Sequence, residues 1–220
     1  MTIRITPSIL NADFSRLNEE IEKVASVSDL IHLDIMDNKF VPNFTFDFDR
    51  AAEIIKDCPI PVDSHLMVEE PEFAAPAFAE MGSASVTYHF EAASKHHQII
   101  TSVHNLGARV GIALKPSTHF DVLEDFIDEI DMILIMTVEP GFGGQSFMNE
   151  MLSKVKQARN RLGKNERGVW LQVDGGISPS TIESAAEAGA DTFVAGSAVY
   201  KADDPAKMVE HLKVLATPKQ

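Results

Sequence analysis

Cysteine is almost absent from this chain of 220 residues, because Cys58 is the only one. An internal disulfide and a thiolate zinc cluster are therefore both excluded, and we expect Cys58 to be a small buried apolar residue in a reducing compartment. No apolar run approaches the roughly 18 residues that a membrane-spanning helix needs. The N-terminus also lacks the charged-then-apolar pattern of a signal peptide. These absences favour a cytoplasmic protein with no membrane partner.

Basic residues are scarce as well. The chain has 19 lysines and arginines against 33 aspartates and glutamates, which gives a formal net charge of -14. Such a surface argues against nucleic acid and anionic membranes as partners. A phosphate group would have to be held by backbone amides and helix N-termini rather than by a basic patch.

Strands and helices are predicted to alternate along the whole chain. Eight apolar, β-branched runs predict strands at Arg4–Ile9, Leu30–Ile35, Pro61–Leu66, Ser85–His89, Arg109–Leu114, Met132–Thr137, Val169–Val173 and Thr192–Ala195. Apolar residues at helical spacing predict helices that include Phe14–Val27, Phe120–Ile130, Met151–Leu162 and Thr181–Ala188. This alternation is typical of parallel βαβ units.

Two architectures suit eight such units at this length, a closed (β/α)₈ TIM barrel and an open doubly wound sheet. Polar residues follow many of the predicted strands rather than flanking one crevice, which favours the barrel. The first strand is not followed by the G-x-G-x-x-G fingerprint of dinucleotide-binding sheets. We therefore predict a single α/β barrel domain over residues 1–220, with a short tail after about Ala216. Exposed apolar helix faces lead us to expect a homo-oligomer.

His32, Asp34 and Met36 alternate along one predicted strand, so their side chains point to the same side of it. The inside of a small barrel is normally filled by branched apolar side chains, and a buried histidine and aspartate need partners. A divalent metal ion would be such a partner, because imidazole nitrogen and carboxylate oxygen both bind these ions. The alternative is a hydrogen-bonded His–Asp pair in the core, and this motif alone does not decide between the two.

His65 and Asp174 favour the metal interpretation. His65 lies on the next predicted strand, between Asp63 and Met67 at alternate spacing, and Asp174 ends the seventh strand before a Gly-Gly pair. Two histidines and two aspartates from three strands would form a four-ligand set for one divalent cation, with room for substrate oxygens. Zinc, iron, manganese and cobalt all accept such ligands. Taken separately, His65 is typical of a core histidine and Asp174 of a turn.

Methionines occur at the ends of three strands. Met36 and Met67 share the phase of the predicted ligands, and Met136 ends the sixth strand. Methionine at such positions is more often a core filler, but here an apolar cap that keeps water from an anionic intermediate is the functional interpretation. Asp37 is out of phase with Asp34, so we interpret it as the cap of a turn.

Glycine-rich loops follow the last three predicted strands. They contain Gly141, Phe142, Gly143 and Gly144, then Gly175 and Gly176, and finally Gly196 and Ser197. Glycine lets the backbone approach a ligand and direct N–H groups at it, and phosphate sites of barrels are often built from the last loops. Together with two carboxylates and two imidazoles, these loops indicate proton transfer on a phosphorylated sugar.

Three further polar residues follow strands or lie near them. Ser8 ends the first strand and could contact substrate hydroxyls. An equally favoured interpretation of this segment is that Asn11 caps the next helix. Lys115 ends the fifth strand, but no second feature supports a Schiff-base role, so we interpret it as a solvated lysine.

The chain resembles the ribulose-phosphate 3-epimerase family over nearly its whole length, from Ile3 to about Leu212. The resemblance is carried by residues 32–37, 40–43, 65–68, 136–147 and 173–177. The Pro-Gly-Phe-Gly-Gly-Gln loop at 140–145, combined with the His-x-Asp-x-Met-Asp pattern at 32–37, is highly specific.

This resemblance implies a (β/α)₈ barrel that interconverts D-ribulose 5-phosphate and D-xylulose 5-phosphate in pentose phosphate metabolism. The metal ligands of the family match His32, Asp34, His65 and Asp174, its proton acceptor matches Asp34, and its proton donor matches Asp174. Its substrate contacts match Ser8, His65, 141–144, 174–176 and 196–197. The chemistry agrees, because a metal on the ketone stabilises an enediolate, and inversion needs two acid/base groups on opposite faces.

Two positions depart from the usual family pattern. Lys39 stands where the family usually has histidine or another residue, which changes the charge at the pocket mouth. Gln172 replaces a usual glutamate, which removes a carboxylate that could tune the metal or Asp174.

Three rival functions share this barrel. An epimerase of a six-carbon ketose phosphate, such as allulose 6-phosphate, is the nearest, although its late loops tend to differ. Decarboxylases and aldolases usually place a lysine between two aspartates of one strand, which residues 34–37 lack. A noncatalytic sugar-phosphate-binding barrel would not need the pair of aspartates.

Overall fold

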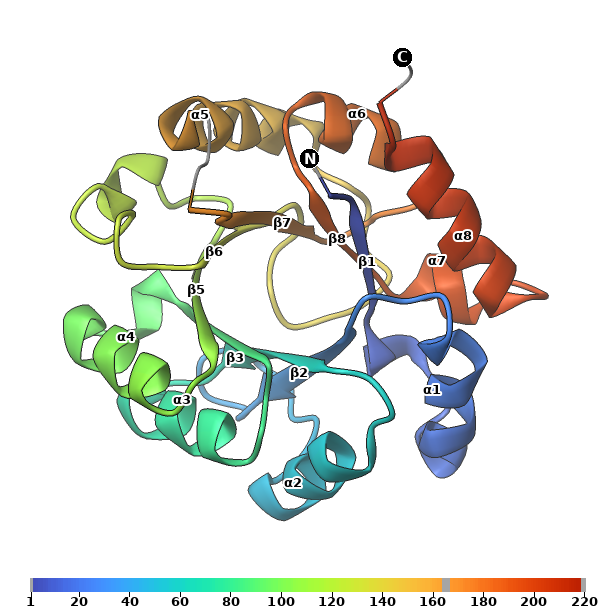
Figure 1. The fold of residues 1–220 in the computed structure, drawn as a ribbon, viewed down its shortest axis with the longest axis horizontal. Coiled ribbons are helices and arrows are strands. Elements are labelled where there is room, and N and C mark those ends of the chain that lie inside the picture. Colours follow the sequence, from blue (N-terminus) through green and yellow to red (C-terminus); the bar gives the residue numbers. More distant parts are fainter. Residues whose placement is uncertain (1, 164–166, 219–220) are drawn as a thin grey trace.

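A ring of eight parallel strands, surrounded by helices, forms the protein (Figure 1). The computed structural model describes residues 2–163 and 167–218. The strands are β1 Arg4–Pro7, β2 Ile31–Met36, β3 Val62–Met67, β4 Ser85–His89, β5 Arg109–Leu114, β6 Met132–Met136, β7 Trp170–Asp174 and β8 Thr192–Ala195. The α-helices are α1 Leu17–Ala25, α2 Phe48–Asp57, α3 Pro71–Glu80, α4 His96–Asn105, α5 Leu152–Leu162, α6 Ile182–Glu187, α7 Ser197–Tyr200 and α8 Pro205–Ala216. The predicted (β/α)₈ barrel is confirmed.

Seven parallel ladders join the strands in the order β1-β8-β7-β6-β5-β4-β3-β2. The two ends of this order, β1 and β2, are linked by a single isolated bridge between Ser8 and His32. Ring closure therefore takes place next to one of the predicted metal ligands.

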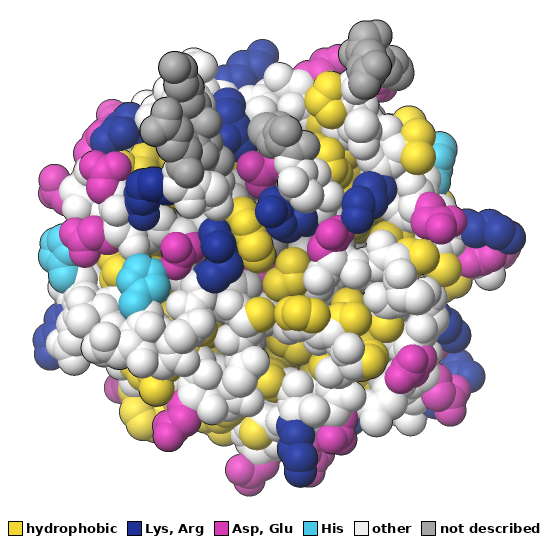
Figure 2. All heavy atoms as spheres, viewed as in Figure 1, with side chains coloured by type: hydrophobic (Ala, Val, Ile, Leu, Met, Phe, Trp, Pro, Cys, Tyr) yellow, Lys and Arg dark blue, Asp and Glu magenta, His cyan; other side chains and the backbone are white. Residues whose placement is uncertain are grey.

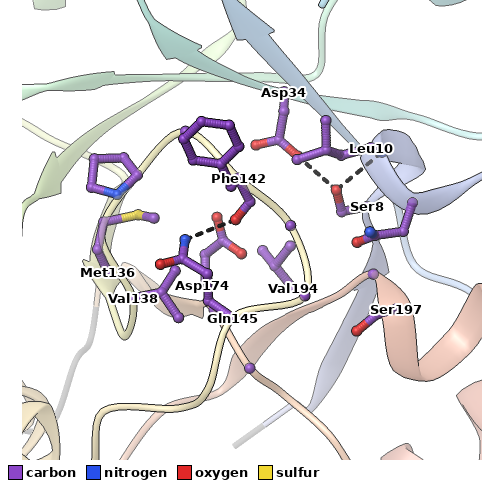
Figure 3. A pocket seen from close by; sticks show the side chains of 18 of the residues that line it. Ser8, Leu10, Asp34, Met136, Val138, Phe142, Gln145, Asp174, Val194 and Ser197 are labelled. Carbon is purple, nitrogen blue, oxygen red and sulfur yellow. Dashed lines mark hydrogen bonds between the residues drawn. The ribbon is translucent and has the colours of Figure 1, made fainter. Parts of the chain in front are cut away.

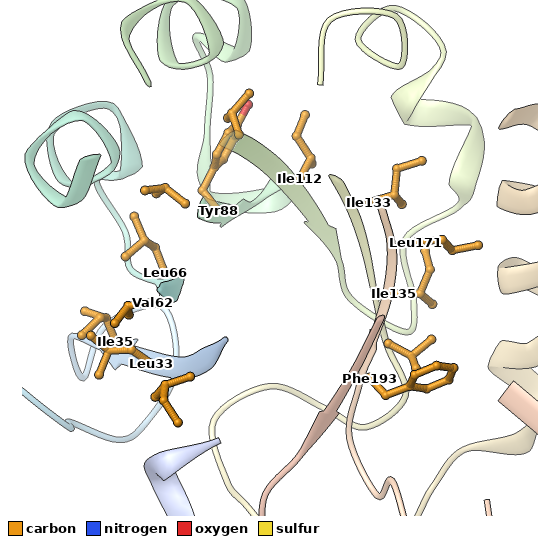
Figure 4. Close-up of a cluster of buried hydrophobic side chains, with 14 of the residues drawn as sticks. Leu33, Ile35, Val62, Leu66, Tyr88, Ile112, Ile133, Ile135, Leu171 and Phe193 are labelled. Carbon is orange, nitrogen blue, oxygen red and sulfur yellow. The ribbon is translucent and has the colours of Figure 1, made fainter. Parts of the chain in front are cut away.

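The apolar core lies between the strands and the helices. Side chains such as Leu33, Leu66, Ile133 and Phe193 leave the outer face of the ring and are fully buried (Figure 4). Burial of each such side chain stabilises the fold by about 1.5–3 kcal/mol. Because alternate strand residues fill this outer layer, the others point into the ring, where most are polar or small.

All eight predicted strands exist, with ends that differ from the prediction by at most two residues. The helix predicted at Phe120–Ile130 is wrong, because only a 3₁₀ turn at Phe120–Leu123 and further turns occupy this segment. Its apolar spacing is real, since Phe120, Leu123, Ile127 and Ile130 are buried. Five acidic residues within 121–129 disfavour a regular helix, and Arg167 takes the carbonyl oxygens of Ile127 and Ile130 as acceptors.

Other predictions concern the ends of the chain and its surface. Cys58 is half-buried against the core, and burial raises the pKa of its thiol. The predicted tail after Ala216 begins where α8 ends, and its last two residues, 219–220, lie outside the described residues, as do 164–166 and residue 1 of the predicted domain. None of the described helices has both the length and the apolar character needed to cross a bilayer. On the face shown in Figure 2, acidic and basic side chains intermingle around a more hydrophobic centre.

Candidate active site

The predicted ligands lie inside the ring, with His32, Asp34 and His65 within their strands and Asp174 at the carboxyl end of β7. The β2–β3 register pairs His32 with Asp63, and one pleat further on it pairs Asp34 with His65. Both histidines are fully buried and Asp34 is 3% exposed, whereas Asp174 at the end of β7 keeps 17% of its side chain exposed. The site therefore has a buried floor and an opening beside Asp174.

Four side chains converge on one point within this floor. Each of His32, Asp34, His65 and Asp174 offers one ligand atom, and these four atoms lie within 4.8 Å of one another. Asp34 Oδ1 is 3.3 Å from His32 Nε2 and 3.1 Å from His65 Nδ1, and the two ring nitrogens are 3.4 Å apart. Asp174 Oδ2 is 4.0 Å from His32 Nε2 and 3.6 Å from His65 Nδ1. Tetrahedral ligands at about 2.1 Å from one cation would be about 3.4 Å apart, which matches these spacings.

The ring of His32 is held from behind by a carboxylate. Its Nδ1 lies 2.9 Å from Asp63 Oδ2, and Asp63 also accepts hydrogen bonds from Gln172 Nε2 at 2.8 Å and from Ser85 Oγ at 2.6 Å. Because a carboxylate only accepts, a neutral His32 carries its proton on Nδ1 and turns the lone pair of Nε2 toward the cluster. In the same way, Ser8 Oγ donates to Asp34 Oδ2 at 2.6 Å and orients that carboxylate.

Burial, charges and hydrogen bonds within this cluster shift the pKa values of its two aspartates in opposite directions. Burial alone would raise the pKa of Asp34, but the charge of His32 and hydrogen bonds from both histidines lower it well below its usual range. Burial and the charge of Asp34 raise the pKa of Asp174 to about 6. Burial disfavours a charged His32, yet the charge of Asp34 and hydrogen bonds to Asp34 and Asp63 raise its pKa well above normal. Positive charge is thus strongly favoured at the centre of the cluster.

A pocket opens above the two aspartates (Figure 3). It is lined by every predicted substrate residue except His65, namely Ser8, Gly141, Phe142, Gly143, Gly144, Asp174, Gly175, Gly176, Gly196 and Ser197. His65 lies beneath, in the cluster. Met36, Met67 and Met136 also line the pocket and are at most 2% exposed, so they give it an apolar wall.

The glycine-rich loops approach one another too closely to carry side chains. A Cβ on Gly176, whose φ is +66°, would lie 2.5 Å from the backbone nitrogen of Phe147. Cβ atoms on Gly143 and Gly196 would lie 2.7 Å and 2.3 Å from the nearest amide atoms of Asn11. Asn11 therefore fills the space between the β6 and β8 loops.

Asn11 does not cap the first helix, although its place in the sequence suits that role. Helix α1 begins after Arg16 without a side-chain cap, and Asp13 caps the short 3₁₀ turn before it. Asn11 instead lines the pocket, and among the described residues its side-chain amide has no hydrogen-bond partner. Its two polar groups are free to bind a ligand.

Three other polar residues stand near the mouth of the barrel. Asp37 caps the turn after β2, as predicted, by accepting hydrogen bonds from the backbone nitrogens of Lys39 and Phe40. Lys39 is exposed and forms an ion pair with Glu69 at 3.6 Å. Lys115 is half-buried rather than solvated, because its Nζ lies 3.9 Å from the centroid of the Phe40 ring.

One contact and two residues of the site escaped the sequence analysis. The contact between Gln172 and Asp63 spans 109 positions of the chain and joins opposite walls of the ring, so no local pattern indicates it. His89 and Glu91 lie behind His65, and only the phase of His89 with Ser85 and Thr87 on β4 could have placed His89 inside the barrel.

Comparisons with known proteins show what this chain resembles. Residues 4–200 match the model of the ribulose-phosphate 3 epimerase family. The ribulose-phosphate 3-epimerase of Mycobacterium leprae is 46% identical over 209 residues, covering 95% of this chain and 93% of its own. That of Bacillus subtilis is 40% identical over 215 residues, covering 96% and 98%. A crystal structure of 3-hexulose-6-phosphate synthase from Salmonella typhimurium shares the fold, with a TM-score of 0.72, 17% identity and coverage of 97% and 98%.

Proposed function

The chain belongs to the ribulose-phosphate 3-epimerase family and is an enzyme with that activity, and we propose that it uses one divalent metal ion to interconvert D-ribulose 5-phosphate and D-xylulose 5-phosphate in pentose phosphate metabolism. The observation that carries the proposal is the pair of pocket-facing carboxylates, Asp34 and Asp174, joined by two histidines around one point. We assign the whole catalytic unit to the single barrel.

The donor set fits a metal ion such as zinc, iron, manganese or cobalt. Nε2 of His32 presents a lone pair to the cluster, where two carboxylates and the second imidazole also converge. These atoms lie 3.1–4.0 Å apart, so positive charge among them, either a proton on a histidine or a metal ion, is needed to hold them together. His32, Asp34, His65 and Asp174 would hold the ion, which would stabilise the negative charge that develops on the substrate's enediolate oxygens.

The two aspartates differ in the way that proton transfer to opposite faces requires. The lowered pKa of Asp34 favours its carboxylate form, which suits removal of the C3 proton. The raised pKa of Asp174, about 6, makes the protonated carboxyl group more accessible near neutral pH than in an ordinary aspartate, which suits return of a proton to the other face. In Figure 3 the two side chains enter the pocket from separate strands, β2 and β7. In the reverse reaction their roles exchange.

The remaining pocket residues suit the rest of a sugar phosphate. Backbone N–H groups of the glycine-rich loops would hold the phosphate, and the free amide of Asn11 between Gly143 and Gly196 would bind a neighbouring oxygen. Ser8 would contact a substrate hydroxyl while it orients Asp34. The methionine wall would keep water from the enediolate.

The direct test is turnover of D-ribulose 5-phosphate by protein whose metal content has been measured. We expect activity that is lost with a chelator and restored by one equivalent of divalent metal, with deuterium from solvent appearing at C3. Faster turnover of allulose 6-phosphate would favour the six-carbon epimerase, and C3 hydrogen that never exchanges would contradict the acid/base assignment.

We also propose that the enzyme is a homo-oligomer. Two large apolar side chains, Phe44 and Phe73, are 58% and 68% exposed. Sedimentation velocity of the purified protein would test this, and a monomer at micromolar concentration would contradict it.

A further inference from the structure

A second polar chain lies behind His65, on the side away from the cluster. His89, the last residue of β4, places its Nε2 2.9 Å from Nε2 of His65, and the two rings stack with centroids 5.0 Å apart. Nδ1 of His89 then lies 3.3 Å from Oε2 of Glu91. Neither His89 nor Glu91 lines the pocket. We call these two residues the His89–Glu91 arm.

The arm is firmly anchored in its surroundings. Oε1 of Glu91 accepts hydrogen bonds from the backbone nitrogen of Lys115, at 2.8 Å, and from the hydroxyl of Thr118. The ring of Phe40 packs on His89 with centroids 4.8 Å apart, and His89 is fully buried. Because His89 is fully buried and one of its nitrogens faces another imidazole rather than a carboxylate, a neutral ring suits this place. A neutral imidazole in this place has one donor and one acceptor nitrogen.

Glu91, at the end of the arm, determines which ring nitrogens of His89 and His65 donate and which accept. Although burial opposes its charge, hydrogen bonds from His89 and Thr118 lower the pKa of Glu91 to about 2, so it is a carboxylate that can only accept. Nδ1 of His89 must therefore carry the proton, which leaves its Nε2 as an acceptor. Nε2 of His65 must then donate, so in the metal-loaded protein the lone pair of His65 is on Nδ1, the nitrogen that faces Asp34 and Asp174.

We propose that His89 and Glu91 are positioning residues that fix the tautomer and ring orientation of His65 so that its Nδ1 is ready to bind the metal. This rests on the metal site of the proposed function. Asp63 orients the ring of His32 directly, whereas Glu91 orients the ring of His65 through the intervening imidazole of His89. Loss of such outer partners typically weakens metal affinity 10- to 100-fold.

Two substitutions of His89 separate positioning from packing. His89→Leu removes both hydrogen bonds, and we expect it to weaken binding of Co²⁺ and Zn²⁺ about 10- to 100-fold in chelator competition, with a changed visible spectrum of the cobalt form. His89→Gln can still accept from His65 and donate to Glu91, and we expect it to restore much of the affinity. His97→Leu removes an exposed histidine of α4 and serves as the matched control. Equal affinity in folded His89→Leu and the parent would overturn the proposal.

Imidazole ¹⁵N spectra of the zinc-loaded parent test the same inference without any variant. We expect protons on Nδ1 of His89 and on Nε2 of His65, and a proton on Nε2 of His89 would overturn the arm even if His89→Leu fails to fold. Failure of the parent itself to bind divalent metal would instead overturn the proposed metal site. A normal parent with unaffected variants would overturn the arm alone.

Discussion

The two ends of the barrel use aspartate in opposite ways. At the amino ends of the strands, Asp29, Asp131 and Asp191 each accept a backbone N–H from a neighbouring strand, at 3.0–3.1 Å. Each also has a basic partner, which is Lys213, His104 or Arg159 respectively, at 2.7–3.0 Å. At the carboxyl ends, Asp34 and Asp174 share two histidines with each other and face an open pocket.

An aromatic side chain completes the amino end. The ring of Trp170 lies between two guanidinium groups, with Cζ of Arg4 at 4.4 Å and Cζ of Arg109 at 4.2 Å from its centroid. The comparison teaches that polar groups stabilise the fold where all their partners are present, and supply reactivity where partners are missing. In barrels of this kind, the carboxyl ends carry the chemistry and the amino ends carry stability. Substitutions at the two ends should therefore separate activity from stability.

The largest effect is expected at the carboxyl end. Asp34→Asn or Asp174→Asn keeps the size of the side chain but removes an acid/base group, so kcat/KM for epimerisation should fall by about 10²- to 10⁴-fold or more. A variant with one aspartate left could still exchange the C3 hydrogen from one face. Coupled assays and deuterium incorporation measure both effects, and exposed Asp203→Asn is the control. Substantial epimerisation by either variant would exclude its assigned role.

At the amino end, Trp170→Ala should give the reverse result. It removes the ring that contacts Arg4 and Arg109, and we expect the free energy of unfolding to fall by about 1–2 kcal/mol. Urea denaturation measures this loss, and Trp170→Phe should recover part of it. The kcat/KM of the folded enzyme should match the parent, and a large loss of activity would break the division between the two ends.

A smaller effect is expected at Asn11, on the pocket side. Asn11→Ala removes a pair of polar groups that only a ligand can use, so KM for ribulose 5-phosphate should rise about fivefold, as for the loss of a hydrogen bond worth about 1 kcal/mol. Steady-state kinetics check this, with Asn18→Ala at an exposed position of α1 as the control. An unchanged KM would mean that Asn11 only fills the space between Gly143 and Gly196.

The smallest effect concerns acid stability and needs no metal. The pKa of Glu91 is about 2 in the folded protein, against an ordinary value of 4.5. Since its folded pKa is lowered, its contribution to stability is present above about pH 4.5 and is lost as the pH falls toward 2. In chelator-treated protein, Glu91→Gln should therefore show a shallower loss of melting temperature over this range. Glu22→Gln on α1 is the control and should lose melting temperature with pH as the parent does. If all three proteins lose it equally, the stabilising role of ionised Glu91 is contradicted.

Much of the fold could be predicted because burial leaves a clear pattern in strands. Outer-facing residues such as Leu33 and Ile35 alternate with inner-facing His32 and Asp34, so both the strand and its functional face are visible in one short run. The misread segment 120–130 has a helical apolar spacing too, but its repeated acids and the Arg167 contacts favour turns. Periodicity reports which side is buried, and not whether the backbone forms a regular helix.

The outer partners of the site could not be predicted, because they depend on register and distance in space. Asp63 was visible beside His65, but its role arises from the β2–β3 pairing that sets it against His32. Gln172 was visible as a departure from the family pattern, and the carboxylate it replaces was interpreted as one that could tune the metal or Asp174. Gln172 donates to Asp63, so its influence on the cluster passes through His32.

The hydrogen bond between Gln172 and Asp63 has a consequence for the size of the site. It ties β7 to β3 across the interior, two residues before the points where these strands deliver Asp174 and His65. This hydrogen bond, between two side chains that are not ligands themselves, therefore helps to fix the separation of those two ligands. The barrel, rather than the incoming ion, therefore determines the distance between these metal ligands.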